Sequence, residues 1–155
     1  MSSRTLYYWD ANIFIAWLTN EPRPADEIAG IEFQVREIDA HTAHLVTSVL
    51  TPTEVLAVGV TADKRDQLKR LFQREHCHLV DVTREVAEIA HDIRVTHLNQ
   101  GRKIKTPDAI QLATAISSGC PVFYTFDKGL PRTINANGKS LVVEKPHPTQ
   151  YPLGL

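Results

Sequence analysis

The sequence lacks three features that would each point to a particular class of protein. It has only two cysteines, Cys77 and Cys120, which make neither a disulfide framework nor a zinc motif, so we expect a reducing, cytoplasmic setting. Its formal net charge is −1, which excludes a generic polycation and requires any nucleic-acid surface to be local. It also has no uninterrupted apolar run long enough to cross a membrane.

The N-terminal segment only superficially resembles a secretory signal. Arg4 precedes a run of apolar residues, but Asp10 and Asn12 interrupt that run and no small-residue cleavage pattern follows. We therefore expect a strand and a helix of the mature protein here. The seven histidines are scattered, and the spacing of His76-Cys77-His78 suits no tetrahedral zinc site.

Length and composition are typical of one soluble domain. A chain of 155 residues with 43% hydrophobic and 23% charged residues can bury a substantial core. We expect a single domain over residues 1–155, with its core at about 5–144 and a Pro-rich extension at 145–155.

Strands and helices are expected to alternate along the chain. The apolar patterns predict strands at Thr5–Trp9, His44–Ser48, Cys77–Val82, Val122–Thr125 and Ser140–Glu144. They predict helices at Ala11–Leu18, Asp26–Ala40, Thr51–Val60, Asp63–Arg74 and about 84–99, the last capped by Thr83. This alternation favours an α/β fold with a mainly parallel sheet covered by helices on both faces.

The segment Lys105–Asp127 is the most informative stretch. Thr106 is the expected N-cap of a helix and Pro107 suits its first turn, which places Asp108 at the helix start. The apolar residues that follow cover most of the helix circumference and predict a buried helix. Gly119 is expected to end it. The next strand is followed by Asp127.

Four acidic residues lie beside predicted helix starts or strand ends: Asp10, Glu54, Asp108 and Asp127. Ligand crevices in open α/β sheets form beyond the carboxyl ends of the strands, so we expect these carboxylates to converge there. Clustered carboxylates repel one another unless protons or cations intervene. Their natural counter-ion is a hard divalent cation with oxygen ligands, Mg²⁺ or Mn²⁺.

Each acid also has a purely structural interpretation. Asp10 could cap the helix that follows it, and Thr51-x-x-Glu54 has the form of a capping box. Asp108 is favoured in a first helical turn by the helix dipole, and Asp127 could lie in a turn before Lys128-Gly129. Taken together, the acids favour a shared site, because Asp10 interrupts one apolar run and Asp127 closes another.

These residues give the chain a resemblance to PIN domains, and in particular to VapC-type toxin ribonucleases of type II toxin–antitoxin pairs. The resemblance covers residues 5 to 144. It rests on Asp10 and Asn12 after the first strand, Glu54 within TSVLTPTEVL, Asp108 within TPDAIQLATA, and Thr125 and Asp127 within YTFD. It implies a Rossmann-like three-layer α/β/α sandwich, four acids around Mg²⁺ or Mn²⁺, RNA cleavage, a cognate antitoxin and a homodimer.

The same resemblance suggests roles for individual residues. Asp10 and Asp108 are the leading candidates for direct metal ligands, completed by Glu54 and Asp127. Asn12 and Thr125 would orient carboxylates through hydrogen bonds, although local capping explains them equally well.

RNA phosphates require cations near the crevice. Arg102, Lys103 and Lys105 lie in the loop before Asp108 and are the expected RNA-binding residues.

Two other classes of protein remain open. A response-regulator receiver domain also clusters acids on a parallel α/β sheet, but it would be expected to show adjacent acids where Asp10 stands alone. A non-catalytic α/β interaction module would use the same acids only as caps and would bind no Mn²⁺ through them.

Overall fold

A six-stranded sheet forms the middle layer of the computed structural model, which describes residues 4–56 and 59–148. The strands are β1 (Thr5–Trp9), β2 (Ala43–Ser48), β3 (Cys77–Val80), β4 (Val122–Tyr124), β5 (Thr133–Ala136) and β6 (Lys139–Glu144). Their order across the sheet is β3-β2-β1-β4-β6-β5. All pairings are parallel except β5 with β6, so the expected mainly parallel sheet is confirmed.

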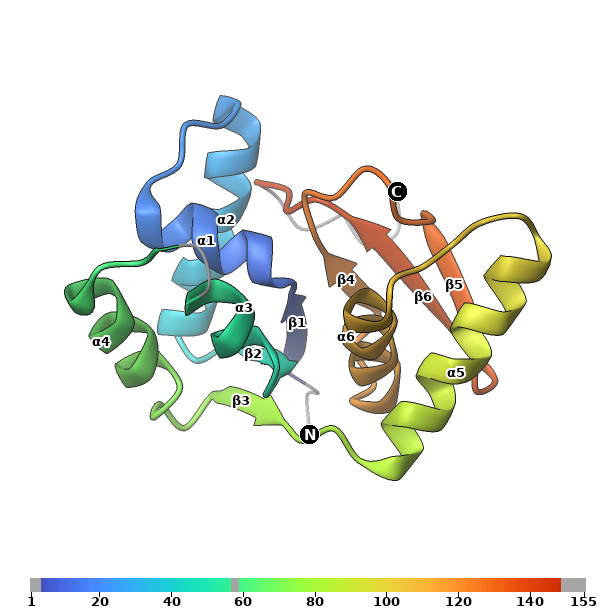
Figure 1. The fold of residues 1–155 in the computed structure, drawn as a ribbon. Helices are drawn as coiled ribbons and strands as arrows, with labels where there is room; N and C mark the ends of the chain where they lie inside the picture. Colours follow the sequence, from blue (N-terminus) through green and yellow to red (C-terminus); the bar gives the residue numbers. More distant parts are fainter. Residues whose placement is uncertain (1–3, 57–58, 149–155) are drawn as a thin grey trace.

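Helices cover both faces of this sheet, as Figure 1 shows. They are α1 (Ala11–Thr19), α2 (Ala25–Asp39), α3 (Thr51–Leu56), α4 (Ala62–Leu71), α5 (Arg84–Asn99) and α6 (Thr106–Ser117). The helices α1, α2 and α4 pack on one face, and α5 and α6 pack on the other. The molecule is therefore the expected three-layer α/β/α sandwich.

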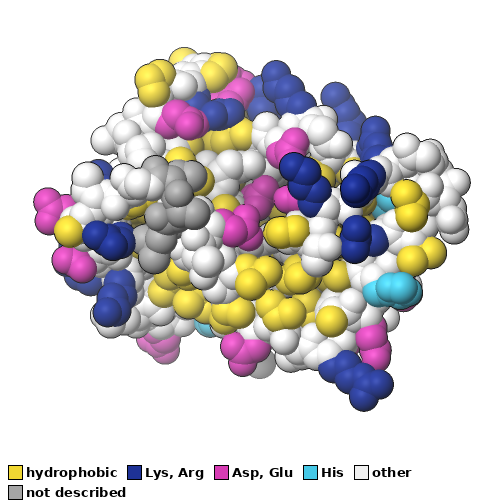
Figure 2. Space-filling view, viewed as in Figure 1, with side chains coloured by type: hydrophobic (Ala, Val, Ile, Leu, Met, Phe, Trp, Pro, Cys, Tyr) yellow, Lys and Arg dark blue, Asp and Glu magenta, His cyan; other side chains and the backbone are white. Residues whose placement is uncertain are grey.

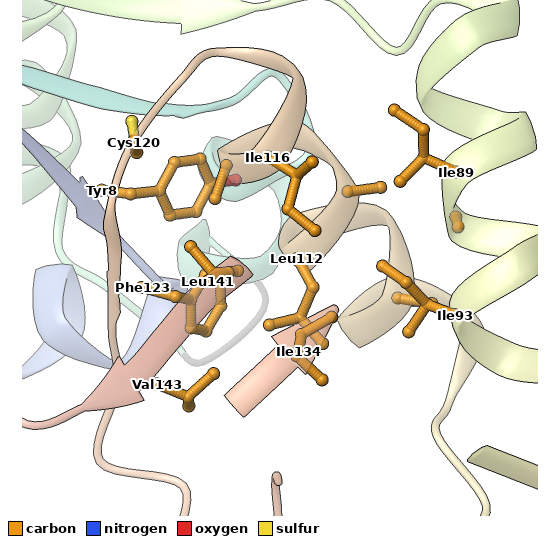
Figure 3. Packing of buried hydrophobic residues seen from close by; sticks show 14 of the residues in the cluster. Tyr8, Ile89, Ile93, Leu112, Ile116, Cys120, Phe123, Ile134, Leu141 and Val143 are labelled. Atoms are coloured by element: carbon orange, nitrogen blue, oxygen red, sulfur yellow. The ribbon is translucent and has the colours of Figure 1, made fainter. Parts of the chain in front are cut away.

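Alternation along β1 divides the core between the two faces. Tyr8 is fully buried on the α6 side and stacks on Phe123, with ring centroids 5.2 Å apart. Figure 3 shows these rings beside Leu112 and Ile116 of α6. Trp9 points to the opposite face and packs against Phe14. Because β1 is buried on both sides, the position of the residue that follows it is tightly fixed.

Several element boundaries differ from those expected from sequence. The helix that begins at Thr51 is described as far as Leu56, and residues 57–58 lie outside the described part. It does not reach Val60 as expected, because Gly59 has φ +74° and Val60 is not helical. Strand β3 ends at Val80 rather than at residue 82, and α4 spans Ala62–Leu71 rather than 63–74.

Strand β5 was not expected. It forms a hairpin with β6 through Asn137 and Gly138, whose φ values of 53° and 71° suit a tight turn between antiparallel strands. The N-cap of α6 also differs: it is Lys105, which makes no side-chain capping bond, and Thr106 is the first helical residue.

The start of the C-terminal extension packs on α2. A Cβ atom at Gly30 would lie 2.4 Å from the carbonyl oxygen of Pro146, so only glycine allows this approach. Lys145 pairs with Asp26 and Glu27 at the start of α2. Residues 149–155 lie outside the described part of the chain. No helix among the described residues is long and apolar enough to span a bilayer.

Candidate functional site

The four predicted acids lie at the carboxyl edge of the sheet or at helix starts beside it. Asp10 follows β1, and Asp127 lies three residues beyond β4, the neighbouring parallel strand. Glu54 and Asp108 lie in the first turns of α3 and α6. Figure 2 shows acidic side chains gathered in a hollow of this face, with Lys and Arg side chains beside it.

The Asp10 carboxylate is buried, with 6% of the residue exposed, and accepts hydrogen bonds from three donors. Its Oδ1 accepts from the backbone N–H of Ala11 at 2.8 Å, which makes it the N-cap of α1. Its Oδ2 accepts from the Thr125 hydroxyl at 2.8 Å and from Asn12 Nδ2 at 3.3 Å. The capping interpretation of Asp10 is thus confirmed, and Oδ2 has partners beyond the cap.

Asn12 and Thr125 connect the two strand ends. Asn12 Nδ2 donates to the Thr125 hydroxyl at 2.9 Å, and Asn12 Oδ1 accepts from the backbone N–H of Phe126 at 3.1 Å. The Thr125 hydroxyl also accepts from the backbone N–H of Asp127 at 3.1 Å. These contacts place both residues where they can orient Asp10, as expected of residues that support a carboxylate site.

The pKa values of two acids show that the carboxylates influence one another. The pKa of Asp10 is raised to about 6: burial raises it most, hydrogen bonds from Thr125 and Ala11 lower it, and the charges of Glu54 and Asp108 raise it. Burial also raises the pKa of Asp108, as do the charges of Asp127 and Glu54, while Lys105 lowers it. All four acids therefore share one electrostatic environment.

Among the described residues, no cation forms an ion pair with these four acids. Across residues 4–56 and 59–148, no three His, Cys, Asp or Glu side chains are gathered closely enough to hold a metal ion. The predicted four-acid cage is consequently not preassembled, and the carboxylates would have to draw together around an ion. The donors themselves, uncompensated carboxylate oxygens, fit a hard divalent cation.

Glu54 has a partner that was not predicted. Gln111 of α6 donates from Nε2 to Glu54 Oε1 at 2.8 Å. The alternative capping box is wrong: the Thr51 hydroxyl contacts Thr47 and Gln111, and the Glu54 backbone N–H donates to the Leu50 carbonyl. The sequence signal for this contact was a glutamine between the apolar residues Ile110 and Leu112 of a helix expected to be buried.

Asp127 also has a local structural role. Its Oδ1 accepts from the backbone N–H of Gly129 at 2.8 Å, so the expected turn is present. Its side chain remains exposed, and its charge acts on Asp108.

The three predicted RNA-binding residues are all exposed in the loop between α5 and α6. Lys105 lies nearest the acids, as its effect on the pKa of Asp108 shows. Arg102 lies beside His97 at the end of α5, where burial lowers the pKa of the imidazole and the charge of Arg102 lowers it as well.

Sequence comparison decides the family. The model of the PIN domain matches residues 7–135. This chain belongs to the PIN domain family. The predicted PIN-domain resemblance is confirmed, and the receiver-domain alternative is set aside. None of the curated proteins compared with this chain matches it in sequence.

Solved structures with the same PIN fold include bacterial toxin–antitoxin proteins. A chain of VapBC2 from Rickettsia felis, solved with a DNA fragment from the promoter, matches with a TM-score of 0.66 at 14% identity, covering 91% of this chain and 98% of that one. VapC20 from Mycobacterium tuberculosis, a toxin that cleaves the sarcin–ricin loop, matches with a TM-score of 0.60 at 15% identity, covering 79% and 90%. A toxin–antitoxin complex from Klebsiella pneumoniae matches with a TM-score of 0.51 at 20% identity, covering 78% and 86%. At these identities the similarity concerns the fold.

Proposed function

We propose that this PIN domain is a metal-dependent endoribonuclease that hydrolyses RNA phosphodiester bonds at the site of Asp10, Glu54, Asp108 and Asp127. The observation that carries the proposal is the placement of the four acids at one edge of the sheet, where burial and their mutual repulsion raise the pKa values of Asp10 and Asp108 and where they have no ion pair with any described residue. Within a PIN fold, such a site is suited to Mg²⁺ or Mn²⁺.

The roles of the residues follow from their positions. Asp10 and Asp108 would hold the cation, with Glu54 and Asp127 completing the site directly or through water. When bound, the cation would activate water for attack on the phosphodiester and offset charge on the leaving oxygen. Asn12 and Thr125 orient Asp10 through the hydrogen bonds that join it to the end of β4.

The substrate would be positioned by cations outside the acid cluster. Lys105 lies close enough to Asp108 to affect its pKa, and Arg102 and Lys103 continue the exposed loop. These side chains would take phosphates while the carboxylates take the metal. Cleavage of the sarcin–ricin loop by VapC20, a protein of the same fold, supports a structured RNA as substrate.

We further propose that the protein acts in the cytoplasm as the toxin of a toxin–antitoxin pair and as a homodimer. The antitoxin would lay an amphipathic segment along an apolar groove. A pocket of about 700 Å³ between α4 and β3, lined in part by Leu68, Phe72 and Leu79, offers such a surface. The toxin–antitoxin complexes of the same fold support this partner.

Metal binding tests the proposed function against a non-catalytic interaction module. Titration of the protein with Mn²⁺ should reveal binding that Asp108→Asn weakens at least ten-fold, because the substitution removes a charged ligand. An interaction module whose acids serve only as caps should bind no Mn²⁺ through them.

A further inference from the structure

The side chain of Gln111 is fully buried, although glutamine is usually exposed. It projects from α6 among apolar residues that pack on β1 and β4. A buried amide requires partners for both of its ends, because an unpaired polar group in a core costs free energy. The identity of those partners therefore indicates what the residue does.

Both ends of the Gln111 amide are occupied. Its oxygen accepts from the Tyr8 hydroxyl at 2.5 Å and, more weakly, from the Thr51 hydroxyl at 3.4 Å. Its nitrogen donates to the Thr51 hydroxyl at 3.0 Å and to Glu54 Oε1 at 2.8 Å. Figure 3 shows the Tyr8 hydroxyl directed toward α6.

The Glu54 carboxylate determines which way the amide faces, because it accepts hydrogen bonds and so requires the amide nitrogen. The Tyr8 hydroxyl donates to the amide oxygen and anchors the opposite end. The reversed amide would place its oxygen against the Glu54 carboxylate and its nitrogen against the Tyr8 hydroxyl. The ring of Tyr8 is itself fixed by burial in β1 and by its stack on Phe123.

Glu54 depends on such a donor. It lies close enough to Asp10 and Asp108 for its charge to raise the pKa of both, so like charges repel its carboxylate from the crevice. In the described part of the chain, the Gln111 amide is the side-chain donor that holds it. The bond engages one of the two carboxylate oxygens, Oε1.

We propose that Gln111 is a positioning residue that holds the Glu54 carboxylate at the acid cluster, with the amide oxygen anchored by Tyr8. This inference rests on the proposed function, because it assigns Glu54 to a metal site. The hydrogen bonds of Gln111 connect α6 to Tyr8 of β1 and to Thr51 and Glu54 of α3. Gln111 touches neither metal nor substrate and acts only through Glu54.

The test is a double-mutant comparison of Mn²⁺ affinity, measured by titration of free Mn²⁺ without RNA. Gln111→Met keeps the length and burial of the side chain and removes the donor. It should weaken Mn²⁺ binding about ten-fold, the usual effect of removing a residue that supports a ligand. In a Glu54→Ala background, the same substitution should change the affinity by less than two-fold, because its target is already gone.

Gln34 provides the matched control. It is a second buried glutamine, 2% exposed, whose amide oxygen accepts from the Trp9 indole at 2.7 Å on the other face of the sheet. Gln34→Met should lower the thermal stability but leave the Mn²⁺ affinity unchanged. If Gln111→Met does not fold, Tyr8→Phe keeps the stack on Phe123 and should weaken binding two- to three-fold, again only when Glu54 is present.

The outcomes separate this inference from the proposed function. Wild-type protein that binds no Mn²⁺ would overturn both. Binding that is weakened by Glu54→Ala but not by Gln111→Met or Tyr8→Phe would overturn the positioning role alone. An equal loss of affinity from Gln111→Met with and without Glu54 would also overturn it, since the effect would then not pass through that carboxylate.

Discussion

The hydroxyl of Thr125 donates to Asp10 Oδ2 at 2.8 Å and so joins the residue after β1 to the end of β4. The hydroxyl oxygen of Thr125 also accepts from the backbone N–H of Asp127 at 3.1 Å. The Thr125 side chain, which is 4% exposed, therefore fixes the relative positions of Asp10 and Asp127, which are 117 residues apart in the sequence.

Removing this hydroxyl should weaken the site more than the fold. Thr125→Val keeps the shape of the side chain but removes the hydroxyl donor to Asp10 and the acceptor of the Asp127 N–H, and leaves the Asn12 amide with only its 3.3 Å bond to Asp10. We expect about ten-fold weaker Mn²⁺ binding and a loss of about 1–2 kcal/mol in the free energy of unfolding. Thr125→Ser, which retains the hydroxyl, should bind Mn²⁺ nearly as the wild type does. Unchanged metal affinity in the valine variant would show that the bond has only a structural role.

The raised pKa of Asp10 makes the metal-free protein less stable as the pH rises. The pKa is about 6 in the folded protein against an ordinary value of 3.8, so the folded state binds more protons between these values. The free energy of unfolding should therefore fall from about pH 4 to pH 7, by at most about 3 kcal/mol from this group. Asp10→Asn should remove most of this dependence and unfold at higher urea concentration than the wild type at pH 7.5 in EDTA.

Urea denaturation at pH 4.5 and 7.5 checks the expected crossover. Asp92→Asn on the exposed side of α5 is the control, and its stability should follow that of the wild type at both pH values. An Asp10→Asn protein that is less stable than the wild type at pH 7.5 would mean that the hydrogen bonds to Asp10 outweigh its burial and repulsion.

Much of this architecture follows from local sequence patterns. The strand before Asp10 and the helix capped by Thr83 are each specified by contiguous residues, and the structure has both as expected. The short strand β5 was missed because four residues carry little periodicity, although Asn137-Gly138 is a typical hairpin signal.

The hydrogen bond between Gln111 and Glu54 could not be predicted for a different reason than strand β5. Gln111 meets Tyr8 across 103 positions and Glu54 across 57, so only the packed sheet and helices bring these side chains together. The Thr51–Glu54 capping box fails for a partly similar reason: Gln111 and Thr47 take the Thr51 hydroxyl, while the Glu54 N–H donates to the Leu50 carbonyl within the helix start.

The cations of the α5–α6 loop should control the salt dependence of RNA binding. Each phosphate neutralised on single-stranded RNA contributes roughly −0.7 to the slope of log K against log salt. In an Asp108→Asn background that prevents cleavage, replacing Arg102 and Lys103 with Ala should flatten this slope by about 1 to 1.5 and weaken binding to unrelated RNAs alike. Mn²⁺ affinity, measured with Asp108 intact, should barely change.

A matched pair on α4 provides the control for charge alone. Lys69 and Arg70 are exposed, and their replacement with Ala should leave the salt slope unaltered. The reverse result, a flattened slope only in the α4 pair, would move the RNA-binding surface to that helix.

Expression of the protein without a partner should stop bacterial growth if it acts as a toxin. Asp108→Asn should be harmless at the same protein level, because it removes a proposed metal ligand, and Asp92→Asn should remain toxic. Growth and protein level are measured together after induction. Harmless wild-type expression at a level confirmed by immunoblotting would count against the toxin role.

The central claim is that the four acids form a metal-dependent site for RNA hydrolysis, and cleavage of a structured RNA tests it most directly. Wild-type and Asp92→Asn proteins should cleave the RNA with Mn²⁺ and lose this activity in EDTA. Asp108→Asn should lose at least 100-fold in rate, about 3 kcal/mol of transition-state stabilisation, while its circular dichroism spectrum stays that of the wild type. Cleavage by folded Asp108→Asn protein at the wild-type rate, or cleavage that persists in EDTA, would contradict the account.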